Sequence, residues 1–258
     1  MTNRERLINY VKHGGKEFIC SPQIGAGAGF DTKVVGKTWF SQTTFEDTKS
    51  ACEKFDMVPL YNFGLPDLVE MTSDIKRVPK PVRENEQGRR FYETEFITPK
   101  GSLNSIVIED ELKGCCQTKY YVTEEEELDI VEYFLDSVLE VTDYSFVTEK
   151  IKEYRRIIGE DTALDIQWQM QPYELFCFPD TMNTAIFALE CPEIFHRLMD
   201  KILALDEKII KAVAKGGADF VFLGGPGSEM ISPKYYEDFI VPYSKQATDM
   251  VHKENMLV

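Results

Sequence analysis

The fold of this chain is decided by residues 192–223, PEIFHRLMDKILALDEKIIKAVAKGGADFVFL, a long amphipathic segment followed by a short apolar run. Proline at its start and the pair Gly216-Gly217 at its end are typical of the first turn and the left-handed cap of a helix. One apolar stripe runs along this helix: Phe195, Leu198, Met199, Ile202, Ile209, Ile210 and Val213. A helix that leads directly into a short buried strand, here 218–223, is the repeating unit of parallel α/β proteins.

The same alternation extends to both ends of the chain. Its pattern predicts strands at 17–24, 57–63, 163–170 and 218–223, with a fifth strand beginning at 256–258. It predicts helices at 3–12, 44–55, 143–158 and 192–216, a helix from 123 that Thr123 and Glu126 cap, and a helix from 232 that Pro242 kinks. The five strands are short, and no GxGxxG sequence follows any of them, which favours a barrel over a nucleotide-binding open sheet.

One excursion interrupts the repeat, at about 74–113. Residues 90–97 alternate in polarity, Thr98-Pro-Lys-Gly101 suits a tight turn, and 103–108 alternate again, so we predict a β-hairpin after the second strand. The predicted architecture is a single α/β domain over 1–258, a TIM-type (β/α)8 barrel. About five β/α units cannot close an eight-stranded barrel, so we expect it to be incomplete here or completed by another chain.

Composition and charge exclude several classes of partner. With 29 Lys and Arg against 44 Asp and Glu, the formal net charge is −15, which disfavours binding to nucleic acid or to an anionic membrane surface. Six cysteines without a CxxC pair indicate reduced thiols rather than a disulfide framework or a metal site. With no apolar run long enough to span a bilayer and a charged beginning, the chain is expected to be cytoplasmic.

Residues 216–243 carry a resemblance to a known family. Gly216-Gly-Ala-Asp-Phe-Val-Phe-Leu223, a short loop, and Ile231-Ser-Pro-Lys-Tyr-Tyr-Glu-Asp-Phe-Ile-Val-Pro-Tyr243 resemble the uroporphyrinogen decarboxylase superfamily. There a GAD strand is followed by an SP…F…PY helix. The resemblance implies a (β/α)8 barrel with its active site at the carboxyl ends of the strands, of which this chain is similar to the N-terminal two-thirds.

The resemblance leaves two chemistries open. The decarboxylases hold their substrate's carboxylates with an arginine-rich loop after the first strand, whereas the corresponding loop here, 21–29, contains no arginine. The other branch comprises methyltransferases that move a methyl group between a small substrate and a corrinoid (cobalamin) protein or a thiol. In that branch zinc is bound by a His-x-Cys pair on the fifth strand and a later cysteine, so the resemblance implies zinc ligands outside this chain and a corrinoid carried by a partner protein.

Candidate site residues follow from the barrel, since side chains at the carboxyl ends of its strands are the functional ones. Glu229 is the candidate catalytic acid or base, or alternatively a group that binds a cationic substrate, as the one carboxylate in the loop after the fourth strand. The candidate substrate-binding residues are Gln23, Asn62, Trp168, Gln169, Gln171 and Tyr173. Amide side chains suit a neutral or weakly polar substrate, and Trp168 could instead belong to the barrel core.

Three functions are therefore weighed. The first is a methyltransferase acting with a corrinoid protein on a small-molecule substrate. The second is a carboxy-lyase like uroporphyrinogen decarboxylase, against which the arginine-free loop argues. The third is a catalytically incomplete fragment or a partner subunit. An incomplete barrel would also expose strand edges, so a homo-oligomer is expected.

Overall fold

A short parallel sheet forms the centre of the molecule. The computed structural model describes residues 1–15, 19, 30–39, 43–55, 57–111, 114–168, 179–223 and 231–258. Its parallel strands, in the order β1-β7-β8, are β1 (Leu60–Gly64), β7 (Ala163–Trp168) and β8 (Phe220–Leu223). Leu257 forms an isolated parallel bridge with Phe220. Three predicted strands are confirmed with shifted ends, and the bridge matches the beginning of the fifth; apart from Ile19, the predicted strand at 17–24 lies outside the described residues.

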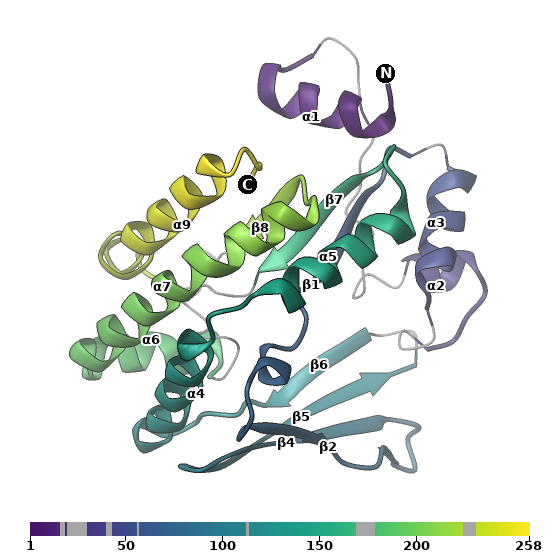
Figure 1. The fold of residues 1–258 in the computed structure, drawn as a ribbon. Helices are drawn as coiled ribbons and strands as arrows, with labels where there is room; N and C mark the ends of the chain where they lie inside the picture. The colour runs from purple at the N-terminus through teal and green to yellow at the C-terminus, as the bar shows by residue number, and fades with distance from the viewer. Residues whose placement is uncertain are drawn as a thin grey trace.

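Helices cover one face of this sheet (Figure 1). The α-helices of the described residues, on either face, are α1 (Asn3–His13), α2 (Phe30–Val34), α3 (Phe45–Lys54), α4 (Leu128–Glu140), α5 (Ser145–Ile158), α6 (Thr181–Glu190), α7 (Pro192–Gly216), α8 (Pro233–Tyr235) and α9 (Val241–Lys253). Leu164, Ile166 and Val221 of the sheet join the main hydrophobic core together with α4, α5, α7 and α9. The α/β class is confirmed, but the strands seen within the described ranges do not form a closed barrel.

Two helix ends differ in detail from the prediction. The cap before α4 uses Glu127 rather than Glu126: its carboxylate accepts hydrogen bonds from the backbone amides of Thr123 and Glu124. The reason is a 3₁₀ turn, Glu125–Glu127, that precedes the α-helix and moves the capping position by one residue. Near Pro242, the expected kink takes the form of a π-helical turn, Tyr236–Ile240, which accommodates the amide that proline lacks.

The excursion is larger than a hairpin. It is an antiparallel sheet of β2 (Lys76–Pro79), β3 (Arg83–Glu84), β4 (Arg90–Thr98), β5 (Gly101–Asp110) and β6 (Gly114–Lys119). The β4–β5 hairpin is confirmed, with Thr98 opposite Gly101 at its turn. The interval 74–113 ends before β6, and β2 and β3 within it were not predicted, because all three strands are brief, polar and largely exposed, and edge strands of this kind carry little periodic signal. The insertion leaves the parallel sheet just after the carboxyl end of β1 and lies below it in Figure 1.

Helix α1 packs on the other face of the parallel sheet, at the amino end of the strands. Leu7 is buried in a small cluster with Val58, Ala163 and Phe220. These contacts lie on the face opposite the helical layer, and we call that face the inner face. Within the described residues, no helix combines the length and the apolar character needed to cross a membrane.

Candidate functional site

The strand register arranges the inner face in layers. Side chains alternate along a strand, so residues that are paired in register between parallel strands lie at one height on one face. Leu60 and Ala163 form the layer nearest the amino ends, where they pack in one cluster with Leu7 of α1. Asn62, Asp165 and Phe220 form the next layer, and Gly64, Gln167 and Phe222 the layer nearest the carboxyl ends. The candidate site consists of the two layers nearer the carboxyl ends of the strands.

Asn62 and Asp165 form a buried polar pair across β1 and β7. The side-chain amide of Asn62 donates to Oδ2 of Asp165 at 2.6 Å. Asp165 is only 4% exposed, and its Oδ1 has no hydrogen-bond partner among the described residues. Burial raises the pKa of Asp165, and the hydrogen bond from Asn62 and the backbone amide of Phe222 offset this only in part. A buried carboxylate oxygen left in this state is expensive, which marks it as a candidate functional group.

The layer above this pair is open and uncharged. A Cβ added at Gly64 would have no atom within 4 Å. Phe222 is 41% exposed although it belongs to the sheet, and Gln167 is partly buried beside it. A small ligand that enters from the carboxyl ends would therefore meet an aromatic ring and an amide before it reaches Asp165.

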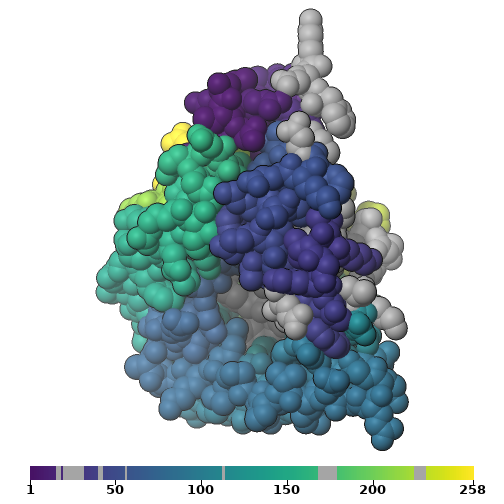
Figure 2. All heavy atoms as spheres, turned by 90° about the vertical axis from the view of Figure 1, so that its right-hand side faces the viewer, coloured from purple at the N-terminus to yellow at the C-terminus, as the bar shows by residue number. Residues whose placement is uncertain are grey.

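The antiparallel sheet adds a second polar surface, on the side of the molecule where the parallel strands have their carboxyl ends. Glu109, 2% exposed, accepts a hydrogen bond from the Tyr92 hydroxyl at 2.7 Å, on the same face of the sheet that packs Phe96 against α4. Further along that face, the guanidinium of Arg90 lies over the ring of Trp39 at 3.9 Å. Figure 2 shows the molecule hollowed between this sheet and the α2–α3 region.

Of the residues predicted from the sequence, Asn62 is the one whose side chain can be placed. It lies on the inner face, within β1 and two residues before the strand ends. Trp168 ends β7, and its side chain lies outside the described part. Also outside the described residues are Gln23, Gln169, Gln171, Tyr173 and Glu229. Sequence reasoning missed Asp165, although a lone carboxylate within the apolar run ALDIQW was a visible signal.

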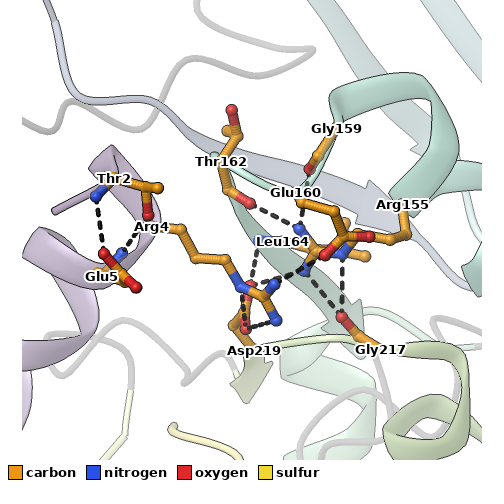
Figure 3. Close-up of polar contacts among 10 residues, drawn as sticks. All are labelled: Thr2, Arg4, Glu5, Arg155, Gly159, Glu160, Thr162, Leu164, Gly217 and Asp219. Atoms are coloured by element: carbon orange, nitrogen blue, oxygen red, sulfur yellow. Dashed lines mark hydrogen bonds and ion pairs between the residues drawn. The ribbon is translucent and has the colours of Figure 1, made fainter.

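A second buried cluster, at the amino ends of the strands, has a structural role. Arg155 donates to Asp219 and to the carbonyls of Gly217 and Thr162, and Arg4 of α1 also donates to Asp219 (Figure 3). The exposed cavity beside it, about 410 Å³, lies next to the carboxyl ends of α5 and α7, whose negative dipoles these basic side chains complement. The amino-terminal side of such a sheet is where side chains stabilise the fold rather than act on a substrate.

No group of three or more His, Cys, Asp and Glu side chains that could hold a metal ion occurs among the residues with described positions. The described residues therefore do not fit a zinc site.

The comparisons with known proteins agree with this geometry. Residues 142–258 match the family model "Uroporphyrinogen decarboxylase (URO-D)". Uroporphyrinogen decarboxylase of Geotalea daltonii is 26% identical over 123 residues, which are 45% of this chain and 36% of the relative. The enzyme of Geobacter sulfurreducens is 25% identical over 120 residues, 44% of this chain and 35% of the relative. The matched region thus spans little more than a third of each curated relative.

A solved structure extends the likeness over nearly the whole chain. A methyltransferase from Methanosarcina mazei superposes with a TM-score of 0.55 at 13% identity, covering 97% of this chain and 67% of the other. At that identity the likeness concerns the fold alone. Taken with the sequence match, it shows that this chain is similar to the uroporphyrinogen decarboxylase superfamily. In particular, its C-terminal half is similar in sequence to the decarboxylases, and its fold to a methyltransferase.

Proposed function

We propose that this chain belongs to a methyltransferase of the superfamily, built on a (β/α)8 barrel that further residues complete. It moves a methyl group between a small-molecule substrate and a corrinoid protein or a thiol. The bond from the methyl carbon to the donor breaks, a bond to the acceptor forms with the acceptor's electron pair, and a thiol acceptor releases its proton.

The charge of the inner face carries this proposal. Its described side chains are Leu60, Asn62, Gly64, Ala163, Asp165, Gln167, Phe220 and Phe222. They include no cation, and Asp165 is a carboxylate. A tetrapyrrole bearing many carboxylates needs cationic groups to replace its hydration, and a buried acid would repel it. The arginine-free loop at 21–29 points the same way.

The test compares the two chemistries on one preparation of the protein. Incubation with methylcobalamin and a simple thiol should yield the methylated thiol, measured by mass spectrometry. Incubation with uroporphyrinogen should release no carbon dioxide above the protein-free control. Decarboxylation without methyl transfer would instead establish the carboxy-lyase alternative. If neither reaction occurs with the protein alone, and methyl transfer begins when a corrinoid protein is added, the chain is a subunit that depends on its partner.

The remaining site assignments stay predictions within this proposal. Glu229 is expected to act as acid or base, and Gln23, Gln169, Gln171 and Tyr173 to bind substrate together with Asn62 and Trp168. Replacing Glu229 by alanine should lower turnover by a factor of about 100 if it transfers a proton, with an unchanged circular-dichroism spectrum. Unchanged turnover would remove Glu229 from the mechanism.

A further inference from the structure

The buried carboxylate of Asp165 is the group that the methyl-transfer function above does not yet use. Its Oδ2 is held by Asn62, while Oδ1 has no hydrogen-bond partner within the described structure. Leaving such an oxygen buried costs free energy, and an aliphatic side chain at this position of β7 would avoid that cost. The arrangement is therefore better suited to a ligand than to the stability of the strand.

The neighbours of Asp165 define the charge of that ligand. None of the inner-face side chains that are described is cationic, so the negative charge of Asp165 has no counterion on that face. The chain as a whole carries a formal charge of −15, which also favours the approach of cations. An anion, or a polycarboxylate, would meet uncompensated repulsion at this point.

The layer above Asp165 defines the shape of the ligand. Phe222 is 41% exposed, and the position of Gly64 leaves open space where another residue would place a side chain. An aromatic face attracts a bulky ammonium group, because its methyl groups carry part of the positive charge and need no hydrogen-bond acceptor. A hydrated metal ion would gain less from such a ring.

We propose, building on the methyl-transfer function, that the substrate carries a methylated ammonium group, which Asp165, held by Asn62, binds from below and the ring of Phe222 contacts from the carboxyl side. Transfer breaks one N–CH₃ bond, its electron pair stays on nitrogen, and the carbon bonds to the electron pair of the nucleophilic corrinoid or thiolate. The cation thereby becomes a neutral amine, so the charge that Asp165 recognises is lost from the substrate in the transfer step. Asp165 thus acts in recognition, and its loss should raise KM more than it lowers kcat.

The test uses two probes of one shape, choline and 3,3-dimethylbutan-1-ol, which differ in having nitrogen or carbon at the quaternary centre. Isothermal titration calorimetry should show choline binding about tenfold more tightly than the neutral alcohol to the unmodified protein. In Asp165→Asn the affinity for choline should fall about tenfold, while that for the alcohol stays the same. Asp161→Asn is the matched control, since it removes the same charge from an exposed residue just before β7 and should change neither affinity.

Three results would overturn the inference: no binding of choline, equal affinities for both probes, or an unchanged affinity for choline in Asp165→Asn. Circular dichroism and a thermal melt establish that the variant is folded. Because binding is measured without a methyl acceptor, the two proposals fail separately. Methyl transfer without choline binding would support the methyltransferase function and contradict the ammonium substrate. Choline binding without any methyl transfer would support the ammonium site and contradict the methyltransferase function.

Discussion

Arg155 and Asp219 form a buried ion pair at 2.7 Å, with both side chains less than a tenth exposed, although 64 residues separate them in the sequence. Asp219 also accepts a hydrogen bond from the backbone amide of Leu164, and Arg155 also donates one to the carbonyl of Gly217 (Figure 3). The pair therefore joins α5, the cap of α7 and the starts of β7 and β8. It fixes the amino ends of the strands whose opposite ends form the candidate site.

Breaking this pair should be strongly destabilising. Asp219→Ala leaves the Arg155 guanidinium buried without its counterion, so we expect the free energy of unfolding to fall by about 3–5 kcal/mol. Urea denaturation followed by circular dichroism measures it. Lys211→Ala is the control, because its ion pair with Glu207 is exposed and its loss should leave the free energy of unfolding nearly unchanged. Equal effects of the two substitutions would contradict the structural role.

Gly216, the last residue of α7, allows that helix to pack closely on α5. A Cβ there would lie 2.4 Å from Cβ of Ile151 and 3.1 Å from the carbonyl oxygen of Thr148. Gly216→Ala should therefore destabilise the protein by about 2 kcal/mol through overpacking. Gly64→Ala, where the new methyl group meets open space, should leave stability within about 0.5 kcal/mol. A thermal melt of both variants decides the matter, and equal melting temperatures would argue against this helix contact.

Glu132 links α4 to α7 in a pH-dependent way. Hydrogen bonds from Arg197, together with Lys201, lower the pKa of Glu132 from its ordinary 4.5 to about 2. The stabilisation is complete above about pH 4.5 and disappears as the pH falls to about 2. Because Arg197 is half exposed, we expect Glu132→Gln to cost only about 1 kcal/mol at pH 7. The difference from the unmodified protein should vanish near pH 2; a constant difference across this range would contradict the assignment.

The ionised form of Asp165 should lower the free energy of unfolding, whereas the ionised form of Glu132 raises it. Burial raises its pKa above the ordinary 3.8, so the folded protein holds this proton more tightly and ionisation destabilises it. Asp165→Asn should therefore increase the free energy of unfolding, by roughly 1 kcal/mol at pH 8. The gain should shrink as the pH falls through the folded pKa and be absent below the ordinary value. Denaturation at several pH values measures this, and a less stable variant at pH 8 would show that the carboxylate serves the fold.

The sequence predicted much of the fold because its signals were local. The capped stripe of 192–216 became α7, Thr98 and Gly101 formed the hairpin turn, and the run 218–223 gave β8. Apolar periodicity and turn residues act within a few positions, and neighbouring residues suffice to reveal them. The family resemblance over 216–243 rested on the same kind of contiguous pattern, and the match at 142–258 confirms it.

The candidate site could not be predicted in this way, because its residues are far apart in the sequence. From the sequence, Asp165 is one acid in an apolar run, and Asn62 is 103 positions away. Only the parallel register of β1 and β7 puts them side by side, and only the lack of a cation among the described residues of the same face gives the pair its chemical meaning. The short, polar strands β2, β3 and β6 likewise exist because β4 and β5 offer them hydrogen bonds. Local patterns determined the elements of this protein, whereas its buried charges acquire their neighbours, and so their function, from long-range pairing in the tertiary structure.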